Sequence, residues 1–230
     1  ATNTQLVQAI HVDPARLRAL FPRYELDAHE VTEWLNKLEH LAPLVVYLGG
    51  CEASVWARKA IRQADMVVFA CRGAAPSGKL TELEAFACEV HPVSARRIVR
   101  IHDRRHGEVS GTAAWLARLP AFMHHHVALQ DQVDVDSLIR FLSGRAIGFV
   151  AAGGGSLGTA HVGIYQAFRE RGAVFDIFVG TSVGSAMAAG FAKNLEAERL
   201  EQGTHEIFVR SRSLRRPTWP RYSLLDHKAF

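Results

Sequence analysis

A serine lies at the centre of a five-residue bend, Gly180-Thr181-Ser182-Val183-Gly184, between an apolar run and a stretch of small residues. The spacing G-x-S-x-G between a strand and a helix is typical of a nucleophile elbow, whose sharp turn forces strained dihedrals on the serine. Glycines on either side leave room for the crossing backbone. The hydroxyl would then project at a helix N-terminus, where unpaired N–H groups favour developing negative charge. The alternative interpretation of this bend is an ordinary Ser-Gly turn between a strand and a helix, with no catalytic role.

A second glycine group follows the apolar run 147–152 and comprises Gly153, Gly154, Gly155 and Gly158. Glycines after a buried strand allow several backbone N–H groups to face one point, as the oxyanion of a tetrahedral acyl intermediate requires. Losing one such donor typically raises the barrier by about 3 kcal/mol. Because the carboxyl ends of neighbouring parallel strands share one sheet edge, we expect this loop and Ser182 to lie together. The predicted chemistry is acyl transfer through a serine.

The same glycines also match G-x-G-x-x-G, the dinucleotide fingerprint, which needs an acid at the end of the next strand. Asp176 has about the right spacing but lies near the start of that strand, too far from the carboxyl edge to reach a ribose. The strand end carries Gly180 and Ser182 instead. The sequence therefore favours the hydrolase interpretation over the dinucleotide one.

β-branched runs alternate with helical patterns along the whole chain. Strands are predicted at residues 5–10, 44–48, 66–71, 98–102, 126–129, 147–152 and 175–179, and helices from residue 14 and at 27–41, 54–63, 81–90, 112–119, 136–142, 159–171 and 185–193. This alternation predicts an α/β fold, a parallel or mixed sheet with helices on both faces. We expect a nucleotidase-like α/β linking or regulatory region over 1–143 and a second domain over 144–230.

The segment Gly-Gly-Gly-Ser-Leu-Gly-Thr-Ala-His-Val-Gly at 153–163, followed by Gly-Thr-Ser-Val-Gly at 180–184, resembles the patatin-like phospholipases. The bacterial relatives of neuropathy target esterase are the nearest resemblance, with weaker similarity over 44–70, 124–127 and 141–146. The family implies hydrolysis of phospholipid or lysophospholipid acyl esters by a Ser–Asp dyad, without a metal or other cofactor. By this match Ser182 is the nucleophile, and Gly153, Gly154, Gly155 and Gly158 shape the oxyanion hole.

The sequence departs from the family pattern at two points. Leu157 stands where the family usually has Arg or Lys, which removes a charge from the loop. The family aspartate belongs to an Asp-Gly pair, and no aspartate from Asp13 to Asp226 is followed by glycine. We therefore expect the dyad aspartate beyond Phe230, with 144–230 as the first part of a catalytic domain. The competing hypothesis is a catalytically inert patatin-like module that binds lipid or a partner.

Residues 73–81 lie between a predicted strand and a predicted helix, and their sequence is close to the motif of a phosphate-binding loop. Leu80 replaces the Ser or Thr that would hold Mg²⁺, and Pro76 removes an N–H donor. An ordinary loop is the favoured interpretation, and a nucleotide-binding regulatory module is a third hypothesis.

Histidines offer two further candidates. His124, His125 and His126 are consecutive, so on a strand only the first and third share a face, and neither has ligand-spaced neighbours. A strand with partly exposed histidines is favoured over a metal site. His161, one turn into a helix, is interpreted as a packing or hydrogen-bonding residue under the glycine loop rather than a triad base.

The composition of the 230 residues, 48% hydrophobic with a net charge of +4, is that of a folded domain with a mild bias towards anionic partners other than nucleic acid. No apolar run reaches the roughly 20 residues that span a bilayer. Three cysteines at unrelated spacings fit reduced thiols, so we expect a cytoplasmic protein. A basic, aromatic segment predicts peripheral membrane contact, with a solvated loop as the alternative. Its residues are Arg212, Arg215, Arg216 and Trp219.

Overall fold

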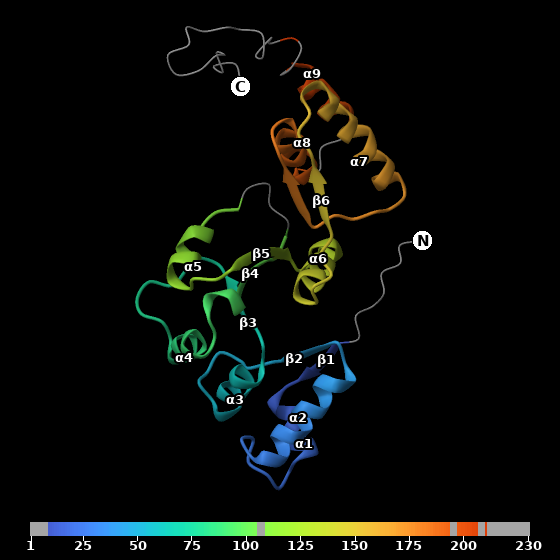
Figure 1. The fold of residues 1–230 in the computed structure, drawn as a ribbon. Helices are drawn as coiled ribbons and strands as arrows, with labels where there is room; N and C mark the ends of the chain where they lie inside the picture. Colours follow the sequence, from blue (N-terminus) through green and yellow to red (C-terminus); the bar gives the residue numbers. More distant parts are fainter. Residues whose placement is uncertain (1–8, 105–108, 194–196, 207–209, 211–230) are drawn as a thin grey trace. The chain divides into compact units, whose positions relative to one another are not determined.

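The computed structural model describes residues 9–104, 109–193, 197–206 and 210 (Figure 1). Its contacts divide the chain into two compact units, one within Gln5–Gly144 and one that begins at Arg145. The predicted basic contact segment, with Arg212, Arg215, Arg216 and Trp219, lies outside the described residues.

The first unit contains two parallel sheets. Strands β1 (Ala9–Val12) and β2 (Leu44–Tyr47) form one, and β3 (Val67–Arg72), β4 (Arg96–His102) and β5 (Met123–Ala128) form the other in the order β3-β4-β5. The helices between and after them are α1 (Pro14–Leu20), α2 (His29–Leu41), α3 (Val55–Gln63), α4 (Glu82–Val90), α5 (Thr112–Arg118) and α6 (Gln132–Leu142). A short 3₁₀ turn, η1 (Val93–Ala95), precedes β4.

Side chains at the helix starts fix several boundaries. Asp13 accepts a hydrogen bond from the Arg16 backbone N–H at 2.8 Å, with Pro14 at the first helical position of α1. Ser54 caps α3 in the same way. Thr81 and Glu84 form a reciprocal capping box at α4. These local bonds explain why the starts of these three helices could be predicted to within one residue.

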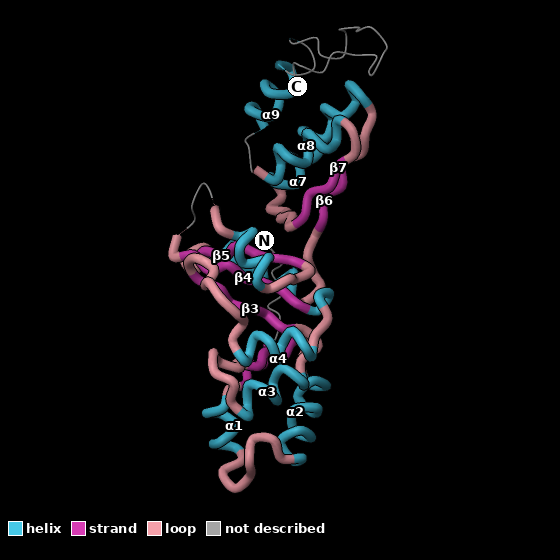
Figure 2. The backbone as a smooth tube through the Cα atoms, turned by 90° about the vertical axis from the view of Figure 1, so that its left-hand side faces the viewer, coloured by secondary structure: helices cyan, strands magenta, loops and turns pink. Residues whose placement is uncertain are grey.

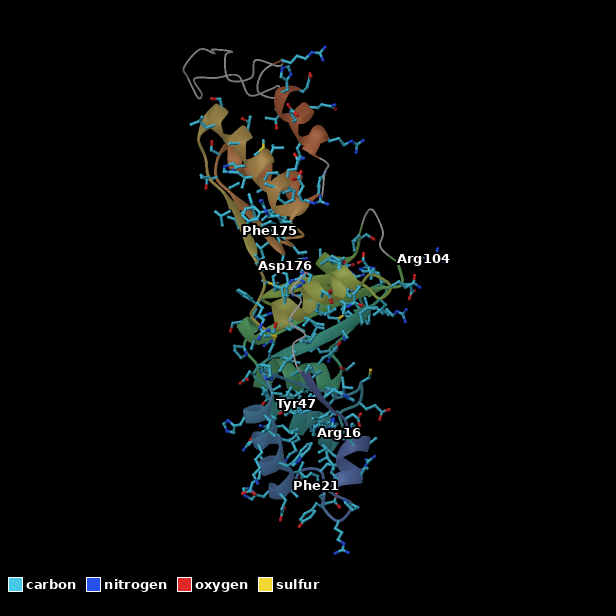
Figure 3. All side chains as sticks on the ribbon, turned by 90° about the vertical axis from the view of Figure 1, so that its right-hand side faces the viewer. Arg16, Phe21, Tyr47, Arg104, Phe175 and Asp176 are labelled. Carbon is cyan, nitrogen blue, oxygen red and sulfur yellow. The ribbon has the colours of Figure 1, made fainter. Side chains whose placement is uncertain are left out.

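Two apolar clusters stabilise the first unit. One contains Val12, Leu17, Val31, Leu35 and Trp56, with Phe21 and Tyr47, labelled in Figure 3, packed against it. The other gathers buried side chains of β3, β4 and α5, namely Cys71, Ile98, Trp115 and Leu119. Burial raises the pKa of the Cys71 thiol to about 11, so this sulfur is protonated at neutral pH and acts as a small apolar group.

The second unit is built on two parallel strands, β6 (Gly148–Ala151) and β7 (Ile177–Gly180). Between and after them come η2 (Gly155–Thr159), α7 (Ala160–Glu170), α8 (Val183–Ala192) and α9 (Ala197–His205). Figure 2 shows α7 and α8 beside these strands. Alternate strand residues turn their side chains to the helices, where Phe149, Tyr165 and Phe191 form an aromatic core. Tyr165 and Phe191 stack with ring centroids 4.2 Å apart.

The predicted α/β class is correct, and the strand pairings among the described residues are all parallel. Among the described residues the pairings form three small sheets, two in the first unit and one in the second. The predicted start of the 126–129 strand was wrong, because pairing with β4 extends β5 back to Met123. Helix α6 begins at Gln132, four residues before its predicted start, because Asp131 caps it. Helix α9 was not predicted. No helix in the described part of the chain is long and apolar enough to cross a membrane.

Candidate active site

Ser182 occupies a backbone conformation that side-chain-bearing residues rarely adopt. Its φ is 54° and its ψ is −128°, and it is the only non-glycine residue with positive φ among those described. It lies between the end of β7 and the start of α8, and its carbonyl accepts hydrogen bonds from the Ser185 backbone N–H at 2.9 Å and Ser185 Oγ at 2.5 Å. Strain of this kind costs about 1–3 kcal/mol and is concentrated at functional sites.

The flanking glycines are required by the close approach of backbone segments. A Cβ at Gly180 would lie 2.1 Å from the Gly184 carbonyl oxygen, and a Cβ at Gly184 would lie 2.2 Å from the Ala151 carbonyl oxygen. Both distances are far below contact separation, and the opposing atoms are backbone atoms that cannot rotate away. The turn therefore needs glycine at both positions, as the elbow interpretation requires.

The structure brings the glycine loop and Ser182 together. A Cβ at Gly153 would lie 3.3 Å from the Ser182 Cβ, and a Cβ at Gly158 would lie 2.3 Å from Cγ1 of Val183. Val183 is buried, so the glycine at 158 lets η2 pack directly on the residue after the serine. The two bends, about 30 residues apart in sequence, meet where the neighbouring strands β6 and β7 end.

The loop presents backbone donors without protein partners. Gly154 has a φ of 155° and Gly155 a φ of 56°, so the chain reverses sharply there. Within the described residues, no backbone or side-chain acceptor binds the N–H groups of Gly154, Gly155 or Val183. Of these three groups, the N–H of Val183 lies at the N-terminus of α8, directly after Ser182.

Three other residues of this unit have defined places. His161 Nε2 donates to the Ala152 carbonyl oxygen at 2.9 Å, so this histidine supports the loop, as expected, and does not bond to the serine. Asp176 accepts from the Ile147 backbone N–H at 3.0 Å, which places its carboxylate at the amino ends of the strands (Figure 3). Leu157 is 78% exposed on the loop.

Three carbonyl oxygens of residues 73–81, in the first unit, are bound by side-chain donors. The Gly73 carbonyl accepts from Arg100 Nη2 at 3.0 Å and Trp115 Nε1 at 3.1 Å, and Arg118 donates to the carbonyls of Gly78 and Lys79. A phosphate-binding loop presents N–H groups to its ligand. This geometry disfavours nucleotide binding here.

The Glu84 carboxylate occupies the N-terminus of α4 behind that loop, where a phosphate would be placed. It accepts from the Thr81 backbone N–H at 2.7 Å and from Arg118 Nη2 at 2.5 Å. Burial alone would raise its pKa, but these bonds outweigh burial and hold the pKa below the usual glutamate value. The anion at this helix start is thus supplied by the chain itself.

The histidines of β5 pair with one another and with a histidine of β4. His126 Nδ1 lies 3.0 Å from His102 Nε2, and His126 Nε2 lies 3.2 Å from the Thr112 hydroxyl. The ring centroids of His124 and His126 are 5.6 Å apart, in keeping with the prediction that these two side chains share a face of the strand. His102 was not predicted as a member of this group, because only the pairing of β4 with β5 brings it beside His126. No three metal-ligating side chains are grouped to hold an ion in the described ranges.

Two stretches of the sequence match family models. Residues 12–148 match the Neuropathy Target Esterase family P-loop like domain, and residues 149–230 match Patatin-like phospholipase. The class of the second unit is therefore that of a patatin-like phospholipase. Because the two models together cover nearly the whole sequence, the chain belongs to the neuropathy target esterase family.

Several named proteins are similar to this chain. Patatin-like phospholipase domain-containing protein ZK370.4 of Caenorhabditis elegans is 29% identical over 207 residues, 70% of this chain and 15% of that protein. Lysophospholipase NTE1 of Mycosarcoma maydis is 26% identical, with 82% and 13% covered. Human patatin-like phospholipase domain-containing protein 6 is 26% identical, with 86% and 16% covered. The chain spans less than a fifth of each relative's length. No solved structure matches.

Proposed function

We propose that this chain carries the nucleophile and oxyanion loop of a serine lipid acyl hydrolase. The observation that supports this most directly is the strained Ser182 held against the backbone of Gly153. Strain at a serine is not explained by packing, because its side chain is exposed at the end of a strand. A strained, exposed hydroxyl next to unpaired N–H groups suits nucleophilic attack on an ester.

In the proposed reaction, Ser182 Oγ attacks the ester carbonyl carbon and the carbonyl oxygen becomes an oxyanion. The N–H groups of Gly154 and Gly155 hold this oxyanion, while Gly153 and Gly158 let the loop approach the elbow. The alcohol leaves as the acyl-enzyme forms, and water then releases the fatty acid. An aspartate takes the proton of the serine hydroxyl and passes it to the departing alcohol oxygen, and no residue of this chain is assigned that role. No metal or other cofactor takes part.

The substrates are phospholipids or lysophospholipids, in keeping with the names of the similar proteins. Residues 144–230 would belong to the catalytic domain, and residues 1–143 would form a linking or regulatory region. The protein would be cytoplasmic and touch the membrane peripherally through the basic segment that contains Trp219. Exposed Leu157 adds no charge to the loop, so the oxyanion depends on backbone donors alone.

A fluorophosphonate probe tests the proposal on the full-length protein. The probe should label the wild type and a Ser94→Ala control, whose serine lies in η1 of the first unit, but not Ser182→Ala. Release of fatty acid from lysophosphatidylcholine should be lost in the same variant. Equal labelling of wild type and Ser182→Ala, or none in either, would overturn the proposal, and the latter result would favour an inert lipid-binding module.

A further inference from the structure

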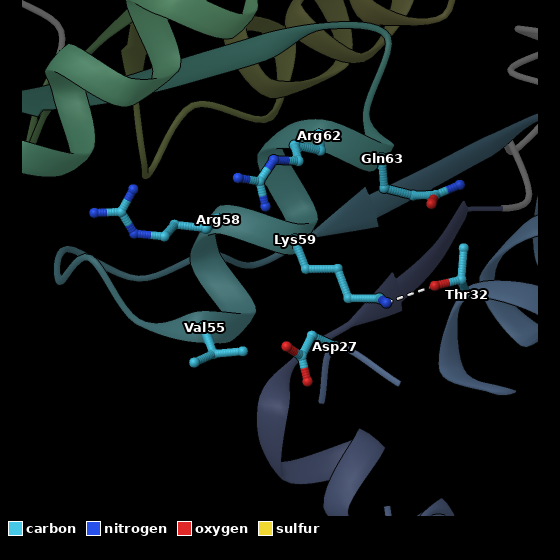
Figure 4. A pocket seen from close by; sticks show the side chains of 7 residues that line it. All are labelled: Asp27, Thr32, Val55, Arg58, Lys59, Arg62 and Gln63. Atoms are coloured by element: carbon cyan, nitrogen blue, oxygen red, sulfur yellow. Dashed lines mark hydrogen bonds between the residues drawn. The ribbon is translucent and has the colours of Figure 1, made fainter. Parts of the chain in front are cut away.

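A cavity of about 400 Å³ lies between α3 and the segment that leads into α2, within the first unit (Figure 4). Its lining residues are Asp27, Thr32, Val55, Arg58, Lys59, Arg62 and Gln63. Cavities of this volume hold small ligands. The cavity belongs to the first unit, whereas Ser182 belongs to the second.

One face of α3 supplies most of the lining. Positions 55, 58, 59, 62 and 63 are spaced by three or four residues, so their side chains share a helix face. Three of the five are cations, and Arg58 and Arg62 stand one turn apart. Like charges at this spacing weaken a helix, and only part of this cost is offset by the contacts of both arginines with Phe86 and of Arg58 with Glu82. Because the cations remain on this helix face despite their mutual repulsion, the face is suited to an anionic ligand.

The cations are held in place before any ligand arrives. The guanidinium groups of Arg58 and Arg62 lie over the same Phe86 ring, 4.8 and 4.9 Å from its centroid. Lys59 Nζ donates to the Thr32 hydroxyl at 2.5 Å, the bond drawn in Figure 4, and to the Ala28 carbonyl at 3.2 Å. Side chains fixed in this way lose little conformational entropy on binding.

The local charges do not cancel. Arg58 pairs with Glu82, and Asp27 faces Lys59 across the cavity. Arg62 has no acidic partner among the described residues, which leaves one positive charge in excess. The Thr32 hydroxyl already donates to the Ala28 carbonyl and Gln63 Nε2 to Asn36 and Glu39, so the donors left for a ligand are those of the cations, and Asp27 is the only acid in the lining.

We infer that this cavity binds a phosphate group, presented by a small phosphorylated molecule or by a phospholipid headgroup. The planar guanidinium forks of Arg58 and Arg62 match the oxygens of phosphate, and Lys59 adds a further charged donor. The Asp27 carboxylate accepts a hydrogen bond from a hydroxyl next to the phosphate, as in glycerol phosphate. The site is separate from the proposed hydrolysis and gives the first unit a ligand of its own.

Calorimetric titration of the full-length protein tests the inference with inorganic phosphate and glycerol 3-phosphate, and cosedimentation tests it with phosphatidylcholine vesicles with and without phosphatidic acid. Arg62→Gln should weaken binding about tenfold, since a hydrogen bond to a charged group is being removed. Arg62→Lys, which keeps the charge but not the fork, should lose less. Arg97→Gln is the matched control, because Arg97 also lies over an aromatic ring, that of Phe122, away from the cavity.

Binding of the soluble esters that Arg62→Gln weakens and Arg97→Gln does not would support a soluble ligand. Binding confined to vesicles that contain phosphatidic acid, with the same dependence on Arg62, would support a lipid headgroup. No binding of any probe, or equal binding by the two glutamine variants, would overturn the inference. Ser182→Ala should bind phosphate like the wild type, which keeps this result independent of the proposed hydrolysis.

Discussion

The imidazole Nε2 of His161 lies 2.9 Å from the carbonyl oxygen of Ala152, the residue immediately before the glycine loop. A carbonyl oxygen only accepts, so the imidazole donates and Nε2 carries a hydrogen. The bond fixes the peptide plane that joins Ala152 to Gly153, and the Cβ of Ser182 lies next to this same glycine. The first turn of α7 thereby supports the start of the glycine loop beside the proposed nucleophile.

Removal of that bond should loosen the loop without unfolding the unit. In His161→Ala, we expect the Ser182 hydroxyl to react with a fluorophosphonate about tenfold more slowly, because misplaced donors stabilise the oxyanion less. His161→Gln keeps a side-chain N–H and should recover part of the rate. Hydrogen exchange of the Gly153–Gly155 amides, which does not depend on catalysis, should accelerate in the alanine variant. Unchanged exchange would contradict the supporting role.

Gly184 and Gly163 should respond in opposite directions to the same substitution. The added methyl of Gly184→Ala would lie 2.2 Å from the Ala151 carbonyl oxygen, so we expect a loss of about 3 kcal/mol of unfolding free energy. A Cβ at Gly163, within α7, meets no atom within 4 Å, and Gly163→Ala should stabilise the protein by about 1 kcal/mol. Denaturant unfolding measures both, and a tolerated alanine at 184 would contradict the elbow geometry.

The strain at Ser182 should be measurable as a stability difference between two variants. Glycine adopts positive φ readily, so Ser182→Gly should be about 1 kcal/mol more stable than Ser182→Ala. The order should reverse at Ser185, which lies within α8, because alanine is the better helix former. Thermal unfolding of the four variants makes the comparison. The same order at both positions would mean that residue 182 is not strained.

His126 should make stability depend on pH between about 6.5 and 4. Burial, followed by the neighbouring His102, His124, Arg100 and His125, lowers the pKa of His126 to about 4. The unfolded value is about 6.5. Between these values the unfolded state binds more protons, so the stabilising contribution is complete above pH 6.5 and is lost as pH falls through 4.

The melting temperature of the wild type should therefore fall as pH is lowered through this window, and His126→Gln should show a flatter profile. His40→Gln, at an exposed position on α2, is the control and should keep the wild-type slope. Acidic groups contribute mainly below pH 4.5, outside most of the window. Identical slopes for the three proteins would contradict the assignment to His126.

Local chemistry explains which features could be predicted. Asp13, Ser54 and Thr81 each accept a hydrogen bond from the backbone N–H three residues further on, so their helices begin near the predicted positions. The bend at Gly180–Gly184 was predicted for the same reason, since the spacing of glycine and serine is itself the signal. Strand β5 was predicted too short, because its first residues gain order from pairing with β4 and not from their own propensity.

The sequence by itself determined the order of strands and helices as far as α8, the family, and the two glycine-marked bends, because each depends on residues within a few positions of one another. Only the tertiary structure decided that Gly153 lies against Ser182, that His161 binds the Ala152 carbonyl, and that Lys59 of α3 reaches Thr32 at a cavity that Arg58, Arg62 and Asp27 also line. Such contacts depend on strand register and helix packing, which bring together residues that no local pattern relates.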